Sequence, residues 1–484
     1  MLSKNISSPG VPSPGRISMS SKRMQQLHVM NQNYTREMFG LRNLGNTCFL
    51  NSILQCLVSV PPLALYFKEK FSPSDICSGA STGARSLNGT GGQLAQEFKA
   101  FMDEALAASG GQCLNPAAVR QVMIKFAPQF SGYNQQDAHE AMRFLLDGLH
   151  EDLNRVRIKP KYVELQDKKG ESLDEAAMRW WSYSMSTGNS VITDIFGGQL
   201  FNETYCHICG HASWAFDTFL DLSLPVPTNR VSSIRDITLT DCLREFTDRE
   251  KLDVEDYKCE NCKRTQHISK RMGIYKPPQV LVIHLKRFSW MSRRKLDVNV
   301  HFPLRGLDIG EFVEANPTVG SRVGSVFDIG NVENEDGMLM DSTMSPVGKY
   351  KNDNNLDRGI SGTSWKNVGR SSVVPTQSLS AFIGGGTSEE DEQRESERQS
   401  ASRMSMGPPR RRGRSNSNRY IYDLVGVSQH AGSMSGGHYT ACVRLGCVRN
   451  ENWANISDST AIPTRQSEDT SSDSSAYVLF YVRR

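Results

Sequence analysis

The hydrophobic positions of this chain follow two different periods, one near its start and one further along. Within residues 48–57 they recur every three or four residues, which is the spacing of an amphipathic helix. A second run with the same spacing lies within residues 137–154. Residues 279–288 and 476–482 are short apolar runs rich in β-branched or aromatic side chains, and they predict buried strands. Helices early and strands late predict an α+β fold.

The pattern of a folded core is interrupted between about residues 312 and 418. Within residues 388–418 only three positions are apolar, and an acidic cluster is followed by an arginine-rich one. Such a segment cannot bury enough apolar surface to offset the entropy lost on ordering. We therefore predict a disordered insertion at about 312–418, inside one domain that spans residues 40–484, because strand-like sequence resumes at Tyr420.

The first 39 residues have a composition of their own. Residues 1–39 are rich in Ser, Pro and Met, and five basic residues precede the first acidic one, Glu37. A start that is rich in Ser and poor in acids also occurs in mitochondrial targeting sequences. Pro9, Pro12 and Pro14 oppose the amphipathic helix that such a sequence needs. We therefore interpret residues 1–39 as a disordered N-terminal tail.

Charge and cysteine content narrow the class of protein. The 56 basic and 52 acidic residues leave a net charge of +4, which indicates neither nucleic-acid nor membrane binding. The longest apolar stretch, residues 58–67, contains two prolines and is too short to span a bilayer. Eleven cysteines without a secretory signal favour a reducing compartment, the cytoplasm or the nucleus or both. In that setting we expect the thiols to act as ligands, as a nucleophile or as core residues.

The first segment that carries chemistry surrounds Cys48. A Gly- and Asn-rich turn leads into the helix predicted from about Cys48, so the thiol lies at the positive end of the helix dipole, which favours the thiolate. Asn43, upstream in the turn, carries an amide that can donate to a developing oxyanion. From this segment alone, Cys48 is equally consistent with a buried structural thiol.

The second segment surrounds His438. A Gly436-Gly437 pair precedes this histidine at the head of a predicted strand. A cysteine nucleophile needs an imidazole nearby to take its proton and return it to the leaving amine. Further along, Ser457 and Asp458 are both candidates to orient the imidazole of His438.

Two C-x-x-C pairs form the third segment with chemical meaning. Each pair chelates from one tight turn, and together they provide four thiolates for a tetrahedral, structural zinc ion. The four predicted ligands are Cys206, Cys209, Cys259 and Cys262. A redox role is the alternative, but no thioredoxin-like βαβ pattern surrounds either pair.

Four segments together resemble the sequence boxes of the ubiquitin-specific proteases. They are the Cys48 segment, residues 135–140, the His438 segment and the ending 477–481, in that family's order. The resemblance covers about residues 40–306 and 420–484 and is greatest to members with a short catalytic domain. It implies a papain-like cysteine protease with a helical thumb, a β palm and zinc-bearing β fingers.

The resemblance also implies a reaction and a set of roles. The chain would be a thiol-dependent deubiquitinase that hydrolyses the amide or isopeptide bond after the C-terminal Gly of ubiquitin. Its partners would be ubiquitin and ubiquitinated proteins, and it would act as a monomer. By position, Cys48 is the nucleophile, His438 the general base and Asn43 the oxyanion donor. The substrate-binding positions are Asp137, Glu140, His430, Gly436, Gly437 and Tyr439.

Two positions depart from the family pattern. Ser457 stands where the family has Asp or Asn, and it is followed by Asp458. We favour Asp458 as the partner of His438, because a bond to a charged acceptor is about twice as strong. His139 stands where the box more often has Gln, and the flanking Asp137 and Glu140 either face the basic ubiquitin tail or satisfy the helix start.

Two other functions were weighed against this one. A catalytically weakened or inactive ubiquitin-binding adaptor is favoured only by Ser457. A zinc-ribbon protein that binds nucleic acid through the arginines of residues 410–414 is the other, although such runs are more often solvated segments. The sequence does not indicate which ubiquitin linkage, ubiquitin-like modifier or target protein is preferred.

Overall fold

A computed structural model describes most of the chain outside the N-terminus and the segment between residues 314 and 420. The described residues are 34–77, 89–168, 170–227, 237–252, 258–264, 268–289, 294–314, 420–433, 436–446, 452–465 and 470–484. The predicted insertion and most of the predicted N-terminal tail therefore lie outside them.

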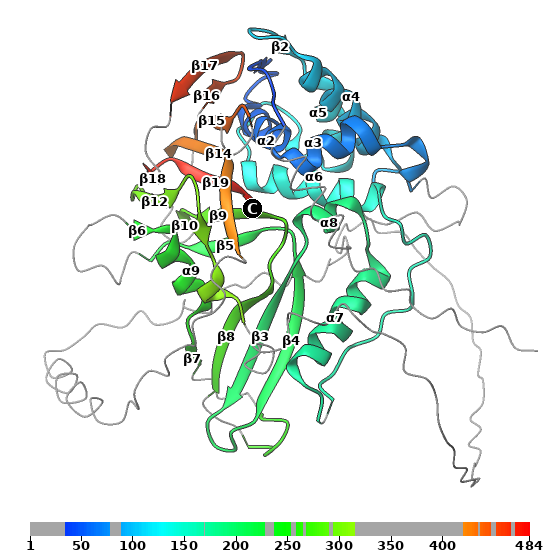
Figure 1. Cartoon of the computed structure of the whole chain (residues 1–484), viewed down its shortest axis with the longest axis vertical. Coiled ribbons are helices and arrows are strands. Elements are labelled where there is room, and N and C mark those ends of the chain that lie inside the picture. Colours follow the sequence, from blue (N-terminus) through cyan, green and yellow to red (C-terminus); the bar gives the residue numbers. More distant parts are fainter. Residues whose placement is uncertain are drawn as a thin grey trace, which may run out of the picture. The chain divides into compact units, whose positions relative to one another are not determined.

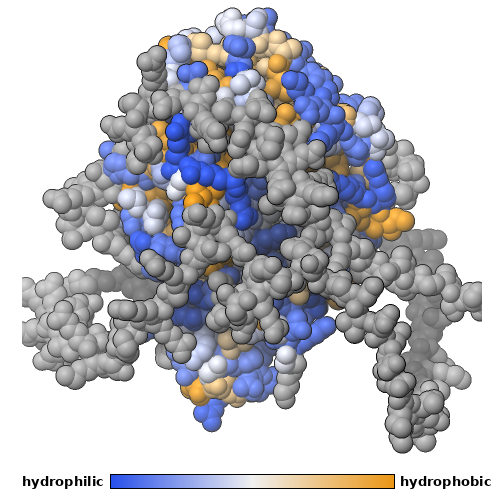
Figure 2. Space-filling view, viewed as in Figure 1, coloured by the Kyte–Doolittle hydropathy of each residue, from blue (hydrophilic) through white to orange (hydrophobic). Residues whose placement is uncertain are grey.

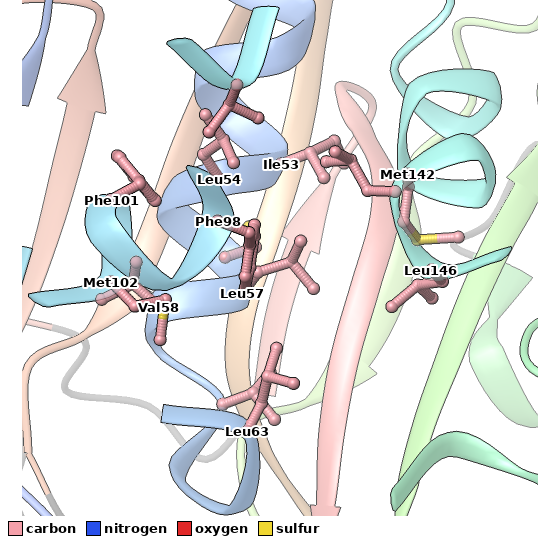
Figure 3. Close-up of a cluster of buried hydrophobic side chains, with 14 of the residues drawn as sticks. Ile53, Leu54, Leu57, Val58, Leu63, Phe98, Phe101, Met102, Met142 and Leu146 are labelled. Carbon is pink, nitrogen blue, oxygen red and sulfur yellow. The ribbon is translucent and has the colours of Figure 1, made fainter. Parts of the chain in front are cut away.

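Helices come first along the chain and pack around one central helix. The α-helices are α2 (Cys48–Val58), α3 (Pro61–Leu65), α4 (Gln93–Ala107), α5 (Ala117–Phe126), α6 (Ala138–Asp152), α7 (Leu173–Thr187), α8 (Val191–Phe196) and α9 (Leu239–Thr247). Every residue of α2 is buried. Its apolar residues pack between α4 and α6 in the cluster of Figure 3, where Leu54 and Leu57 lie near Phe98 and Ile53 lies near Met142.

Strands form a central sheet that lies against α2 (Figure 1). The strand order in this sheet is β17 (Thr460–Arg465), β16 (Asn452–Ser457), β15 (Gly436–Arg444), β14 (Ile421–Ser433), β19 (Ala476–Arg483), β9 (Val280–Lys286) and β5 (Leu222–Pro225), with β13 (Leu307–Asp308) paired to β14. One face packs on the helices around α2, and the other covers a second core with α9. The long strands β14 and β19 alternate between these two cores, which explains their nearly continuous apolar sequence.

A second sheet projects away from the helices that surround α2 (Figure 1). Its order is β4 (Ala212–Phe219), β3 (Gly198–Cys206), β8 (Ile268–Lys276) and β7 (Glu250–Leu252). Helix α7 packs on it through Ala176 and Ala177 against Phe201 and Phe216. The turn after β3 and the segment before β8 carry the two C-x-x-C pairs, so this finger sheet brings all four cysteines to one end.

Short pairings and single helical turns complete the described architecture. The remaining strands are β1 (Gly40–Leu41), β2 (Cys113–Leu114), β6 (Ile237–Thr238), β10 (Phe288–Ser289), β11 (Arg294–Lys295), β12 (Val300–Pro303) and β18 (Thr470–Asp473). A π-helix covers Tyr66–Lys70, and 3₁₀ turns cover Pro73–Asp75, Pro128–Phe130 and Gly310–Phe312. Strand β1 pairs in parallel with β2, which ties the segment before Cys48 to the segment before α5.

The folded body begins earlier than residue 40. Tyr34 and Phe39 are buried, and the Tyr34 hydroxyl donates a 2.5 Å hydrogen bond to the carbonyl of Val58. The Arg36 guanidinium is buried and donates to the carbonyl of Gln55 and to the hydroxyl of Ser59. The expected boundary at residue 39 is therefore wrong for residues 34–39, because these side chains cap the end of α2. Residues 1–33 lie outside the described part of the chain.

The described contacts continue to residue 314, near the start of the predicted insertion. Phe312 is buried, and the N–H of Glu314 donates to the carbonyl of Ile274.

No single helix in the described ranges is long and apolar enough to cross a membrane, although α2 and Pro61–Lys70 together meet the length and composition criteria as a pair bent by 80°. On the face in Figure 2 the described surface is mostly hydrophilic, with hydrophobic residues in small separate patches.

Candidate active site

Cys48 is the first residue of α2, as the sequence predicts, and only 2% of it is exposed. The turn before it is held by Asn43, whose Oδ1 accepts hydrogen bonds from the N–H groups of Gly45 (2.9 Å) and Thr47 (3.3 Å). Gly45 has a φ of +97°, and a Cβ there would lie 2.4 Å from the Tyr133 ring, so both the turn and its packing require glycine. These contacts fix the amide of Asn43 just upstream of the thiol.

The imidazole of His438 is paired with Ser457. Nε2 of His438 lies 2.8 Å from Oγ of Ser457. The expectation that Asp458 would be this partner therefore disagrees with the structure. Because Nε2 is occupied by the serine, Nδ1 is the ring nitrogen that remains for proton transfer.

Asp458 lies next to Ser457 but points to a different part of the site. Its two carboxylate oxygens accept 2.8 Å hydrogen bonds from Nδ2 of Asn43 and Nδ2 of Asn51. Asp458 begins the two-residue turn between β16 and β17 and has a φ of +49°, a conformation that Asp tolerates. Consecutive strand residues face opposite ways, and this turn directs the carboxylate toward α2 instead of His438.

Gln135 links the two halves of the site. Its Oε1 accepts from the N–H of Gly437 and its Nε2 donates to the carbonyl of Gly437, both at 2.5 Å. The same Nε2 lies 3.4 Å from Sγ of Cys48. One side chain therefore joins Cys48 to the residue that precedes His438.

The two acids at the start of α6 have different surroundings. Asp137 is the N-cap: its Oδ1 accepts from the N–H groups of His139 and Glu140, and its Oδ2 accepts a 2.6 Å bond from the Tyr477 hydroxyl. Glu140 is exposed and forms no ion pair within the described part of the chain. Partial burial, and then the charge of Asp137, raise the pKa of Glu140. Asp137 therefore serves the helix, and Glu140 is the more available of the two for a ligand.

His139 faces the interior. Its Nε2 lies 2.8 Å from the carboxylate of Asp221, and its ring stacks on the ring of His284 at 3.9 Å and 13°. Burial lowers the pKa of His284 well below its usual value. The unusual histidine in this box is thus part of a packed contact between α6 and the central sheet.

The two glycines before His438 and the rings of His430 and Tyr439 form a tightly packed wall. His430 is 3% exposed, its ring lies 4.6 Å from the Tyr439 ring, and burial followed by Lys295 lowers its pKa to about 4. A Cβ on Gly437 would lie 2.5 Å from Nε2 of His430, so only glycine fits. A Cβ on Gly436 would meet no described atom within 4 Å, so the described residues require glycine only at Gly437.

The four cysteines of the two C-x-x-C pairs converge at the end of the finger sheet. Their Sγ atoms all lie within 4.8 Å of one another. The separations between Cys206 and Cys262 and between Cys209 and Cys259 are 3.9 and 3.7 Å. Sulfurs at about 2.3 Å from a tetrahedral zinc would be about 3.8 Å apart, so the residues fit the metal.

The two cysteine turns have the same backbone design. In each, the residue four positions after the first cysteine donates its N–H to that cysteine's carbonyl and has a positive φ: Gly210 at +69° and Lys263 at +55°. Lysine rarely adopts this conformation, which indicates that the turn geometry is imposed by the four-cysteine cluster.

Comparison with known proteins identifies the family. A model of the ubiquitin carboxyl-terminal hydrolase family matches residues 39–481. The chain belongs to this family. The match includes each of the segments described above, from the turn before Cys48 to strand β19.

Relatives and solved structures agree with the assignment. Human ubiquitin carboxyl-terminal hydrolase 2 is 37% identical over 336 residues, which are 68% of this chain and 50% of the relative. Human ubiquitin carboxyl-terminal hydrolase 3 is 41% identical over 289 residues, 56% of this chain and 54% of the relative. This chain therefore spans about half the length of the curated relatives it matches.

The fold itself is also found in a solved structure of an assembly. Ubp8 in the SAGA Ubp8/Sgf11/Sus1/Sgf73 module bound to ubiquitin aldehyde superposes with a TM-score of 0.53 at 20% identity, covering 92% of this chain and 69% of that one. The expected α+β, papain-like fold of the ubiquitin-specific proteases is thereby confirmed.

The sequence missed three polar residues of this hydrolase site. Gln135 lies in the family box at residues 135–140, of which the sequence singled out only Asp137, His139 and Glu140. Asn51 is one of three buried polar residues of α2, with Ser52 and Gln55, and buried polar residues on a mostly apolar helix were a usable signal. Tyr477 lies in a continuous apolar strand, where nothing in the pattern distinguishes its hydroxyl.

Proposed function

We propose that this chain is a thiol-dependent deubiquitinase that hydrolyses the amide or isopeptide bond after the C-terminal Gly of ubiquitin. The observation that carries this proposal is the convergence on Cys48 of segments distant in sequence. Gln135 contacts the Cys48 sulfur and the carbonyl of Gly437, which precedes His438, and Asn43 lies in the turn before α2. Membership of the hydrolase family supports the same reaction.

The geometry suggests a role for each group. The Cys48 sulfur attacks the scissile carbonyl, and the oxyanion is held by the Asn43 amide and the N–H of Cys48. Asn43 gives one amide proton to Asp458, and its second proton remains for substrate. His438 protonates the leaving lysine amine through Nδ1, and as a base it then activates the water that releases ubiquitin from the thioester.

The acids near the start of α6 provide the binding site for the ubiquitin tail, which is cationic before its terminal Gly-Gly. Glu140 is placed to bind an arginine of the tail, and Asp137 orients Tyr477 beside it. Gly437, His430 and Tyr439 supply the narrow wall that a Gly-Gly pair requires. Gly436 contributes only the absence of a side chain.

The cofactor in this proposal is a structural zinc ion. Cys206, Cys209, Cys259 and Cys262 hold it, and four thiolates leave no coordination position for water. When bound, the metal fixes the tip of the finger sheet and takes no part in catalysis. The finger sheet is then available as a rigid surface for the body of ubiquitin.

A ubiquitin C-terminal electrophile and a fluorogenic ubiquitin amide test the function. The wild-type chain forms a covalent adduct and releases the fluorophore, whereas Cys48→Ala does neither but still binds ubiquitin. Cys113→Ala, at an exposed cysteine of β2, is the matched control and behaves as wild type. Robust cleavage by clean Cys48→Ala protein would refute the mechanism.

An inactive or weakened ubiquitin-binding adaptor remains the second candidate, because Ser457 gives His438 a neutral partner. A neutral hydroxyl does not stabilise the imidazolium as a carboxylate does. The same experiment separates the two functions, since an adaptor binds ubiquitin without forming the adduct.

A further inference from the structure

We infer that a basic pocket beside Asn43 binds an acidic side chain of the protein that carries the modified lysine. The pocket has a volume of about 310 Å³ and is open to solvent. It is lined by Arg42, Asn43, Leu44, Ala117, Arg120 and Gln121, with no acidic residue among them. This inference rests on the proposed function and adds a preference for the leaving side of the substrate.

The two arginines of the lining favour an anion. Arg42 and Arg120 form no ion pair with any residue that the structure describes. Nη2 of Arg120 donates to the carbonyl of Gly132, while its Nε is buried without an acceptor in the described ranges. Arg42 is exposed and Arg120 is partly exposed, so their guanidiniums can pair with a carboxylate that enters the pocket.

Helix α5 adds positive electrostatic potential to the pocket. Ala117 is its first residue, and its first turn contains no acid, although the N–H of Ala117 donates to Oδ1 of Asn115 (3.2 Å). The positive end of this ten-residue helix therefore faces the pocket together with the two guanidiniums.

The pocket and the acids Asp137 and Glu140 lie on opposite sides of His438. Asn43 is bonded to Asp458, in the turn between β16 and β17, and Asp137 is bonded to Tyr477 on β19. His438 is on β15, which lies between these two places in the strand order β17-β16-β15-β14-β19. In Figure 1, α5, β16 and β17 gather at one end of the molecule.

This arrangement identifies the occupant. A cationic ubiquitin tail is attracted to Glu140 and repelled by Arg42 and Arg120, so it does not occupy the pocket. A substrate whose cationic tail lies beside Glu140 crosses His438 and then enters the basic pocket, on the side of the leaving amine. The chain that continues there is the polypeptide around the modified lysine, and an Asp or Glu beside that lysine complements the two arginines.

Two conjugates that differ only in charge test this inference. In each, ubiquitin is joined by an isopeptide bond to the lysine of a short peptide, flanked by Glu in one and by Gln in the other. Dissociation constants are measured for the full chain carrying Cys48→Ala, so that no catalysis is needed. We expect the Glu-flanked conjugate to bind about fivefold more tightly, a preference that shrinks at high salt.

Substitutions locate the preference. Arg42→Gln and Arg120→Gln, each added to Cys48→Ala, bring the ratio of the two dissociation constants close to one. Lys125→Gln removes a charge from the last turn of α5, outside the pocket, and leaves the ratio unchanged. Because the readout is a ratio, a general loss of affinity does not imitate the effect.

Each outcome decides a separate question. Equal binding of the two conjugates by the Cys48→Ala chain, or a preference that survives both arginine substitutions, overturns the pocket and leaves the proposed function standing. Failure to bind either conjugate or free ubiquitin overturns the proposed function, and the pocket falls with it.

Discussion

The Nδ2 atom of Asn43 donates a 2.8 Å hydrogen bond to the carboxylate of Asp458. The other oxygen of that carboxylate binds Asn51, a residue of the buried helix α2. Asp458 therefore ties the proposed oxyanion donor to the helix that carries Cys48. A hydrogen-bond donor that is held in place before reaction stabilises the transition state without reorganisation.

Asp458→Ala is expected to lower kcat by about 10- to 100-fold with little change in KM. A misplaced Asn43 stabilises the oxyanion of the transition state less, whereas binding of the ground-state substrate changes little. Steady-state kinetics on a ubiquitin C-terminal fluorogenic amide measure this. The pH profile keeps its shape, since Asp458 is not bonded to His438. A profile that shifts instead would mean that Asp458 acts on the imidazole.

Ser457 is expected to orient His438, because its Oγ accepts or donates at 2.8 Å to Nε2. Ser457→Ala then lowers kcat about tenfold, and Ser457→Asp raises kcat above wild type by giving the imidazolium a charged partner. Melting temperatures establish that each variant is folded. If Ser457→Ala matches wild type, the 2.8 Å contact has no part in catalysis.

Gln135 gives a prediction that the sequence did not suggest. Gln135→Glu places a carboxylate oxygen where Nε2 now lies 3.4 Å from Sγ of Cys48 and 2.5 Å from the Gly437 carbonyl. Repulsion of the thiolate should lower kcat/KM at least tenfold, more than Gln135→Ala does. In Gln135→Glu, the rate of Cys48 alkylation by iodoacetamide should therefore begin to rise at a higher pH than in wild type.

A matched control for this experiment is Gln136→Glu, which adds the same charge one residue away. It should leave the alkylation profile as in wild type. Identical profiles for Gln135→Glu and wild type would show that Nε2 of Gln135 does not act on the sulfur.

The residues that the sequence placed correctly are those whose geometry is local. Cys48 begins α2 because an apolar helical period starts there after a Gly and Asn turn. Each C-x-x-C pair lies in one turn, and the four cysteines form a cluster once the two turns meet. These assignments depend on spacing along the chain.

The residues that the sequence misplaced depend on single dihedral angles or distant contacts. The choice between Ser457 and Asp458 is set by the +49° φ at Asp458, which no periodic pattern encodes. The boundary at residue 39 missed Tyr34 and Arg36, because their partners Val58 and Gln55 are about twenty residues away. Neither contact leaves a trace in local composition.

Glu140 predicts how tail binding depends on pH. Burial and then Asp137 raise its pKa, so it takes up a proton at a higher pH than an ordinary glutamate, whose pKa is about 4.3. Protonated Glu140 no longer attracts an arginine, so affinity for ubiquitin is full at neutral pH and falls as the pH drops through the raised pKa. Calorimetric titration of Cys48→Ala with ubiquitin at several pH values measures this.

Glu140→Gln should bind ubiquitin more weakly at neutral pH and lose most of this pH dependence. Glu104→Gln, at an exposed position of α4, is the control and should keep the wild-type curve. An unchanged affinity for Glu140→Gln would assign this acid to the start of α6 alone.

The finger sheet provides the last prediction, which concerns the metal. If the four sulfurs hold zinc, the purified chain contains about one equivalent of zinc, and a strong chelator removes it. Cys262→Ser should abolish the stoichiometric zinc and increase proteolysis at the turns around Cys209 and Cys259, because the three remaining thiols no longer complete the site for the metal that links the two turns. Cys113→Ser, which changes an exposed cysteine far from the cluster in sequence, should retain the metal.

Reactivity of Cys48 toward a small alkylating agent should survive in Cys262→Ser, since the metal is structural, whereas ubiquitin affinity should fall with the loss of a rigid finger surface. A chain that is free of zinc yet resists proteolysis as well as the wild type would show that the cluster is held by its backbone hydrogen bonds alone.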